Sequence, residues 1–333
     1  MHGNIQKGVR FGAALALALV LCATAALAAE TGGKRLVPVG HTVGVKLFSR
    51  GVVVVKLPEG STPARTCGLK TGDVIEACGG RTVTSTEQFQ SLLQENGTDT
   101  TELSVKRQGS PVKLSVEPER NEEGACCIGA WVRDSMAGIG TVTYYDPDSN
   151  TFGALGHGIT DGDTAALMPF GNGAILPSTV KAVKKGSCGS AGELRGEFDL
   201  TEELGQLYAN TGCGIFGTLN AACSLAEGEA LPVGDASEGP AVIRSNISGD
   251  EVQEYAVEIL KTIPDAPDGR ELVISVTDPE LIAATGGIVQ GMSGSPILQN
   301  GQLVGAVTHV LLSDPTKGYG ISVETMLNTG AMT

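Results

Sequence analysis

The hexapeptide GMSGSP, residues 291–296, lies between the apolar stretches 287–289 and 297–298. Ser293 has a glycine two residues before it and another directly after it, a pattern that suits a nucleophile on a tight turn. Glycine adopts φ angles that other residues avoid and lets the backbone approach a carbonyl oxygen closely. We therefore expect the backbone amides of Gly291 and Ser293 to form an oxyanion hole, in which one donor is worth about 3 kcal/mol of barrier.

A histidine that suits a general base precedes this serine. The chain has four histidines, of which His2 lies in an N-terminal leader and His41 opens a separate domain, which leaves His157 and His309. His157 follows the short apolar stretch 152–155 and stands between two glycines. A histidine at a strand end between two glycines is well placed to point into a cleft. The sequence therefore favours His157 as the base.

A carboxylate is expected to hold the tautomer of this base and to stabilise its protonated form. Asp278 ends the alternating run 271–277, which predicts a strand, and a strand end is a rigid place for an orienting acid. Asp161 is the alternative, although it lies only four positions after His157, a spacing that also suits a loop-shaping role. If Asp278→Asn kept near-normal turnover, the role of the acid would pass to Asp161 or Asp199.

The order histidine, aspartate, serine along the chain is that of chymotrypsin, whereas subtilisin-like and α/β-hydrolase chains use other orders. Residues 301–310, GQLVGAVTHV, predict a further strand, which would form one wall of the pocket for the residue before the scissile bond. Thr308 and His309 alternate in direction on this strand, so only one of them can face that pocket. His309 is a candidate for binding a substrate side chain, and the alternative is a histidine that faces the barrel core or solvent.

Further motifs extend well beyond the serine. They are AGIGT (137–141), YDP (145–147), GALGH (153–157), GMSGSPI (291–297), GAVTHV (305–310), DPT (314–316) and GYG (318–320). Together they resemble the stage IV sporulation protein B (SpoIVB) peptidase family of endospore-forming bacteria, over nearly the whole exported chain. The resemblance implies that His157 is the base, Ser293 the nucleophile and Asp278 the acid. It also implies a mainly β fold, in which a trypsin-like double β-barrel serine peptidase domain follows a PDZ domain.

The composition agrees with this fold. The 333 residues include 47 glycines and only 7 phenylalanines, which points to many turns between short strands, and the length favours two domains plus a leader. The formal net charge is −14, and it becomes −16 without Lys7 and Arg10 of the leader. Such an acidic chain is not expected to bind nucleic acid or anionic lipid.

The cysteines give no sign of a metal site. Seven follow the leader, an odd number, and no Cys-x-x-Cys pair occurs among them, so we expect no zinc site. Catalysis by serine, histidine and aspartate needs no cofactor, and we expect none. Outside the cytoplasm Cys67 could pair with Cys78 and Cys213 with Cys223, and the alternative is buried free thiols.

Residues 1–29 are expected to form a signal peptide or a membrane anchor. Lys7 and Arg10 precede the apolar run 11–21, and Ala26-Leu27-Ala28 offers a small-x-small cleavage site. The apolar stretch continues to about residue 29, so an uncleaved leader would be long enough to span a bilayer. The sequence leaves both alternatives open.

Residues 38–118 are predicted to form the PDZ domain. Residues 52–55 are all valine and predict a strand, and residues 64–75 match the PDZ pattern in which a short helix leads into Gly-Asp and a strand. Residues 85–93 predict a capped helix, and residues 40–47 are the expected carboxylate-binding loop. Such a domain adds a peptide C-terminus or an internal segment to a sheet edge, and the alternative is a spacer or clamp. After a charged linker, the peptidase domain is predicted to span residues 126–333.

The resemblance also implies a role in sporulation. A protein of this family would be made in the forespore and exported to the space between the two membranes. There it would cut the extracytoplasmic part of a membrane-bound regulator of an intramembrane protease, which then processes a sigma factor precursor. Self-cleavage is compatible with this role.

Two other classes of function compete with this interpretation. A quality-control protease of the high-temperature-requirement type also joins a trypsin-like domain to PDZ, but there the protease domain comes first. A non-enzymatic peptide-binding scaffold would use the glycine-rich turn only structurally, and the order of histidine, aspartate and serine argues against it.

Overall fold

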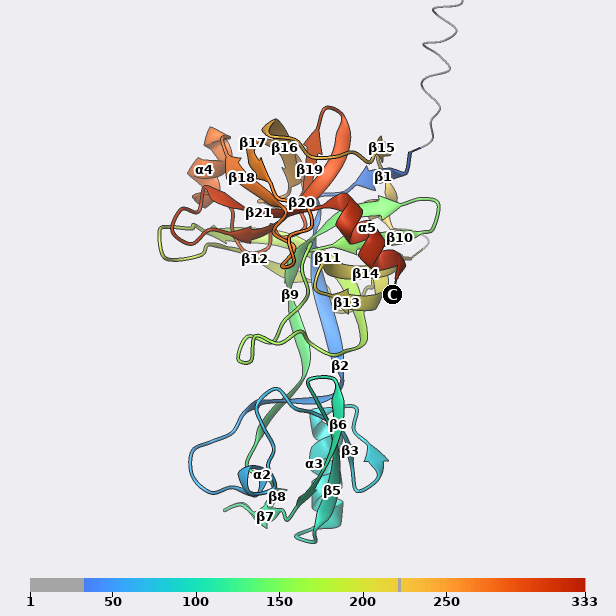
Figure 1. Cartoon of the computed structure of the whole chain (residues 1–333), viewed down its shortest axis with the longest axis vertical. Helices are drawn as coiled ribbons and strands as arrows, with labels where there is room; N and C mark the ends of the chain where they lie inside the picture. Colours follow the sequence, from blue (N-terminus) through green and yellow to red (C-terminus); the bar gives the residue numbers. More distant parts are fainter. Residues whose placement is uncertain (1–32, 221–222, 333) are drawn as a thin grey trace, which may run out of the picture. The chain divides into compact units, whose positions relative to one another are not determined.

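The computed structural model describes residues 33–220 and 223–332, which are mostly β-strand (Figure 1). The leader predicted for residues 1–29 lies outside the described residues. None of the helices in the described part has the length and apolar character that crossing a membrane requires. Each cysteine of this part is a free thiol.

The C-terminal part of the chain, from residue 239 on, contains a closed six-stranded barrel (orange to red in Figure 1). Its strands, in the order β16-β17-β18-β21-β20-β19, are β16 (Gly239–Ser245), β17 (Gln253–Thr262), β18 (Leu272–Val276), β21 (Lys317–Ser322), β20 (Gln302–Val310) and β19 (Pro296–Gln299). In β17, Tyr255, Val257 and Ile259 point inward and alternate with exposed residues, as expected for a strand with one buried face. Helix α4 (Pro279–Thr285) follows β18, and α5 (Val323–Ala331) ends the chain.

A second ring of strands precedes this barrel. Pairing runs in the order β9-β10-β14-β13-β11-β2, and β2 also pairs with β9, which closes the ring. The members are β2 (Thr42–Lys56), β9 (Trp131–Asp146), β10 (Thr151–Ala154), β11 (Phe170–Lys184), β13 (Gly205–Thr211) and β14 (Gly214–Leu219). Shorter elements flank it: β1 (Arg35–Pro38) on β9, β12 (Glu193–Phe198) on β11, β15 (Leu231–Pro232) on β1, and the 3-10 turn η1 (Ser224–Ala226). The predicted double β-barrel is thus confirmed.

The PDZ lobe lies between the two long strands β2 and β9 along the chain. Its sheet joins the end of β2 to β3 (Val74–Cys78), β5 (Thr101–Arg107) and β6 (Ser110–Val116). Its other elements are α2 (Pro63–Thr66), β4 (Arg81–Thr82), α3 (Thr86–Asn96), β7 (Glu119–Arg120) and β8 (Cys126–Cys127). The predicted helix is confirmed as α3, because Ser85 accepts a hydrogen bond from the Gln88 amide at 3.1 Å and caps it.

The expected carboxylate-binding loop at residues 40–47 is a buried strand instead. Residues 42–47 of β2 pair with β9 on one side, and residues 43–48 pair with β11 on the other. No edge is left here for a peptide. Gly44 has a packing role, since a Cβ atom there would lie 2.6 Å from the Phe198 Cβ atom.

The long strands therefore belong to both parts of the molecule. The first half of β2 lies in the barrel, and its residues Val53, Val54 and Lys56 pair with Arg133, Val132 and Trp131 at the start of β9. The PDZ lobe is thus inserted within a barrel of the peptidase, so the range 38–118 includes residues of the barrel sheet.

Candidate active site

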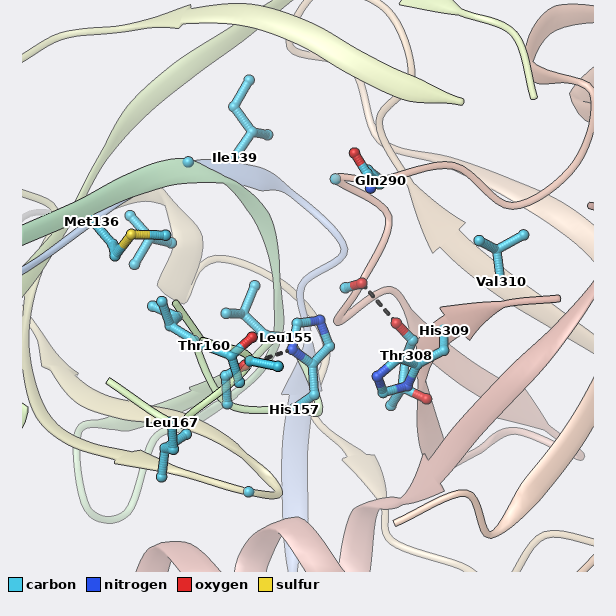
Figure 2. Close-up of a pocket in the computed structure, with 18 of the residues that line it drawn as sticks. Met136, Ile139, Leu155, His157, Thr160, Leu167, Gln290, Thr308, His309 and Val310 are labelled. Atoms are coloured by element: carbon cyan, nitrogen blue, oxygen red, sulfur yellow. Dashed lines mark hydrogen bonds between the residues drawn. The ribbon is translucent and has the colours of Figure 1, made fainter. Parts of the chain in front are cut away.

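A cleft of about 770 Å³ is lined by two of the three predicted catalytic residues, His157 and Ser293 (Figure 2). Both barrels contribute to it. The N-terminal barrel supplies residues 136–139 of β9 and the segment that carries His157, and the C-terminal barrel supplies Gly291, Ser293 and residues 308–310. The structure therefore brings Ser293 and His157, the predicted nucleophile and base, together in one cavity, and their catalytic roles stay predictions.

Two peptide units on the serine turn are held so that their amides stay free. The Gln290 carbonyl accepts a hydrogen bond from the Leu194 amide at 2.8 Å, and the Met292 carbonyl accepts one from the Ser295 amide at 2.9 Å. In a trans peptide the N–H points opposite to the carbonyl, so these bonds also fix the amides of Gly291 and Ser293. Within the described residues neither amide donates a hydrogen bond. This is the arrangement that an oxyanion hole needs.

Thr141 on β9 joins the N-terminal barrel to this turn. Its hydroxyl donates to the Gly291 carbonyl at 2.7 Å, and its amide donates to the Ser293 carbonyl at 3.0 Å. Its own carbonyl accepts from the Leu155 amide at 3.1 Å, just ahead of the histidine. Thr141 is fully buried, so these bonds form away from water. The AGIGT motif is visible in the sequence, but the sequence alone does not indicate this role for its threonine.

The backbone just before His157 has an unusual conformation. Leu155 and Gly156 both have φ of +68°, in the left-handed region, and a Cβ atom on Gly156 would lie 2.8 Å from Thr308. This sharp turn after β10 directs the imidazole into the cavity (Figure 2). Its Nδ1 lies 2.9 Å from the carbonyl oxygen of Gly158. A proton on Nδ1 would be donated to that oxygen, which leaves Nε2 free to act as a base.

Burial controls the charge of this histidine. Desolvation lowers the pKa of His157 below its ordinary value, and the hydrogen bond to Gly158 opposes this effect only in part. The side chain is therefore neutral at neutral pH, as a general base must be.

Ser293, the predicted nucleophile, makes no hydrogen bond to His157, the predicted base. Ser293 Oγ donates to the Thr308 carbonyl at 2.8 Å, shown by a dashed line in Figure 2. Proton transfer requires that Oγ exchange this acceptor for Nε2 of His157. Catalytic hydrogen bonds of this kind often form only when substrate binds.

Asp278 has a different environment from the one predicted for an orienting acid. It is the N-cap of α4, and its carboxylate accepts from the amides of Glu280, Leu281 and Ala256 at 2.9, 3.0 and 3.3 Å. Within the described residues no interaction joins it to His157, and it does not line the cleft. The run Asp-Pro-Glu could have shown this role, since Pro follows good N-caps at the first helical position.

Asp161 and Asp199, the alternative acids, also accept hydrogen bonds from residues of their own loops. Asp161 is buried, binds the Arg133 guanidinium and accepts from the amides of Asp163 and Thr164. Asp199 accepts hydrogen bonds from the amide and hydroxyl of Thr201. In the described part of the chain, the Gly158 carbonyl is thus the only hydrogen-bond partner of His157 Nδ1.

Thr308 and His309 take opposite sides of β20, as expected. The Thr308 side chain is buried, whereas the His309 ring faces the cleft beside His157, with 5.1 Å between the ring centroids (Figure 2). The pKa of His309 is lowered to about 4, first by desolvation and then by the neighbouring His157 and Arg270. A neutral imidazole can both donate and accept a hydrogen bond, which suits contact with a substrate side chain. Its role in substrate binding stays a prediction.

No group of three or more histidine, cysteine, aspartate or glutamate residues in residues 33–220 and 223–332 could hold a metal ion.

The fold and the cleft define a serine peptidase that carries a PDZ domain. The family model of the SpoIVB peptidase S55 family matches residues 124–327, and that of the PDZ domain matches residues 37–117. The first match covers more than half of the chain, and the protein belongs to the SpoIVB peptidase S55 family.

Matches to individual proteins are more limited. Serine protease HTRA1 of Xenopus tropicalis is 35% identical over 74 residues, which are 22% of this chain and 15% of that protein. HTRA1 of Xenopus laevis is 34% identical over 74 residues, which again are 22% of this chain and 15% of that protein. Among solved structures, the active form of the Rv3671c protease from M. tuberculosis is 16% identical, covers 60% of this chain and 74% of its own, and has a TM-score of 0.31. The PDZ domain of an SdrC-like protein from Listeria monocytogenes is 21% identical over 25% of this chain and 87% of its own, with a TM-score of 0.23.

Replacing Thr141 by valine should lower kcat/KM by about 10- to 100-fold, because the Gly291 carbonyl loses its buried donor and the oxyanion-hole turn loosens. Thr141→Ser is the matched control, since it keeps the hydroxyl. Steady-state kinetics on a peptide substrate measure both variants. Equal activity of the valine and serine variants would show that this hydroxyl does not hold the turn.

Asp278→Asn should leave kcat within about threefold of the wild type, because asparagine is also a good N-cap. Asp278→Ala should lower the free energy of unfolding by about 1 kcal/mol through loss of the cap. An orienting acid would behave differently, since its exchange for asparagine costs about 10⁴ in turnover in the template enzyme. A loss of that size would show that Asp278 joins His157 in the working enzyme.

Proposed function

We propose that this protein is an exported serine endopeptidase with a regulatory role and a narrow substrate range. The observation that carries the catalytic part is the juxtaposition of Ser293, two unbonded amides and a buried neutral His157 in one cleft between two barrels. Family membership supports a serine peptidase, and the particular roles of these residues are part of the proposal.

The reaction follows from the atoms in the cleft. His157 Nε2 takes the proton from Ser293 Oγ as the oxygen attacks the scissile carbonyl. The amides of Gly291 and Ser293 bind the oxygen that becomes negative. His157 then gives its proton to the leaving amine, and water hydrolyses the acyl-enzyme by the reverse sequence.

The resting geometry supports a regulated enzyme. Ser293 Oγ is held by a backbone carbonyl, and no carboxylate in the described residues stabilises protonated His157. Both features lower the reactivity of the free enzyme toward arbitrary peptides. A substrate that binds well can use its binding energy to bring the serine to the histidine.

The lining of the cleft suggests what the substrate offers. Met136, Ile139, Leu167, Ile288 and Val289 make most of the surface around the catalytic residues apolar. His309 adds a neutral imidazole beside the base. We infer a preference for an extended segment with apolar side chains and one side chain that can hydrogen bond to His309.

The biological setting is also proposed. The basic and apolar leader at residues 1–29 supports export, with the body of the protein outside the cytoplasm, free or tethered by that leader. Family membership supports a role in sporulation, in which the enzyme cuts the extracytoplasmic part of a membrane-bound regulator and so permits processing of a sigma factor precursor. The PDZ lobe offers a second peptide-binding element for such a partner, and cleavage of its own chain is part of the same hypothesis.

The purified protein should react with a fluorophosphonate probe at Ser293 and yet leave casein largely intact, because the probe needs only the nucleophile whereas casein lacks the specific segment. Ser293→Ala should abolish labelling. Ser295→Ala should keep it, since Ser295 is fully buried and does not line the cleft. Mass spectrometry of the labelled peptide identifies the residue. Labelling in Ser293→Ala, or rapid general digestion of casein, would contradict the proposal.

The acidic limb of kcat/KM against pH should lie below about pH 6.5, the ordinary pKa of histidine. Burial lowers the pKa of His157, so the basic form persists as the pH falls and is lost only when the pH passes through this lowered value. The pH–rate profile of a peptide substrate measures it. A limb near pH 7 or above would indicate a carboxylate next to the imidazolium instead.

A further inference from the structure

Arg133 and Asp134 are adjacent near the start of β9, and their side chains make contacts on opposite faces of the strand. Successive side chains of a strand point to opposite faces, and here the two faces belong to different parts of the molecule. Asp134 contacts helix α3 of the PDZ lobe, and Arg133 contacts the loop that follows His157. The same strand then lines the cleft with residues 136–139 and reaches Thr141 at the serine turn.

The contact with the PDZ lobe is at the first turn of α3. The Asp134 carboxylate accepts from the Thr86 amide at 2.8 Å and from the Thr86 hydroxyl at 3.1 Å. A carboxylate at this end of a helix satisfies an amide without an intrahelical partner and interacts favourably with the helix dipole. Desolvation alone would raise the pKa of Asp134, yet these hydrogen bonds hold it below its usual value. Asp134 is therefore charged whenever the enzyme works near neutral pH.

The contact with the histidine loop is an ion pair with two carboxylates. The Arg133 guanidinium donates to Asp161 and, at 2.9 Å, to Asp163. Asp161 is only 1% exposed and also accepts from the amides of Asp163 and Thr164, so it holds the backbone of residues 161–164 together. A guanidinium suits such a site, because its planar fork can bind two carboxylates in fixed directions.

This loop determines where His157 stands. It begins with Gly158, whose carbonyl oxygen lies 2.9 Å from His157 Nδ1, and residues 158–160, 165 and 167 line the cleft. The buried Asp161 would remain without its cation if Arg133 moved away, an expensive state that the loop would relieve by shifting. A displacement of about 1 Å at a catalytic group can cost about 100-fold in rate.

We propose that Arg133 is a positioning residue for His157, and that Asp134 makes its position depend on helix α3. This proposal rests on the catalytic role of His157 proposed above. A groove of about 190 Å³ lies between α3 and residues 127–132, directly before these two residues on the chain. A peptide that binds along α3 therefore acts on a strand whose next residues hold the histidine loop and the wall of the cleft.

The test measures how fast a fluorophosphonate probe labels Ser293 per active site, together with kcat and KM for a peptide substrate. Arg133→Met should lower the labelling rate and kcat by about 10- to 100-fold with KM changed less than twofold, and Arg133→Lys should restore part of the loss. The matched control is Arg81→Met, which removes an exposed pair with Glu95 in the PDZ lobe. A merely structural effect would lower the active fraction and the unfolding temperature but not the rate per active site.

The dependence on α3 is tested by a second pair of variants. Asp134→Ala should lower the labelling rate in the same direction, although Asp134 does not line the cleft. Ser85→Ala is its control, because it removes a cap from the same helix end without touching β9. Equal rates for Asp134→Ala and Ser85→Ala would overturn the coupling to α3.

The remaining outcomes separate this proposal from the proposed function. An unchanged labelling rate in Arg133→Met, with His157→Ala inactive, would overturn the positioning role and leave the peptidase assignment intact. Unchanged labelling in His157→Ala would overturn the catalytic assignment itself.

Discussion

The three hydrogen bonds of Thr141 are the constraint on which the site depends. Through its hydroxyl, amide and carbonyl, this buried residue holds Gly291, Ser293 and Leu155 at once. The proposed nucleophile comes from the C-terminal barrel and the proposed base from the N-terminal one, so contacts between the barrels must fix their separation. Gly294 makes the close approach possible, because a Cβ atom there would lie 2.0 Å from the Thr141 carbonyl oxygen. The glycines of the serine motif thus serve packing between barrels as well as the turn.

A carbonyl oxygen has taken the place expected for a carboxylate. The Gly158 carbonyl can fix the tautomer of His157, which is one of the two tasks of a triad acid. It carries no negative charge, so it contributes less to stabilising the imidazolium in the transition state. Together with the Ser293–Thr308 bond, this geometry supports the low resting reactivity that we propose for this peptidase.

Much of this could be predicted from the sequence. The serine turn, the histidine between glycines, the capped helix α3 and the double barrel were all predicted, because each depends on local residue patterns or on a specific set of motifs. Asp278 was harder, since an aspartate at a strand end suits an orienting acid and a helix cap equally well, and only the three-dimensional contacts separate them. The course of residues 42–47 was also beyond local patterns, because pairing with β9 and β11 involves residues about 100 positions or more away.

We propose that Ser293, His157 and two free amides form one catalytic centre oriented by backbone carbonyls. A crystal structure of the enzyme with a peptidyl phosphonate bound to Ser293 tests it most directly. We expect a phosphonyl oxygen to accept hydrogen bonds from the amides of Gly291 and Ser293, while His157 Nδ1 stays bonded to the Gly158 carbonyl. A phosphonyl oxygen away from these amides, or a carboxylate bound to His157 Nδ1, would contradict this catalytic centre.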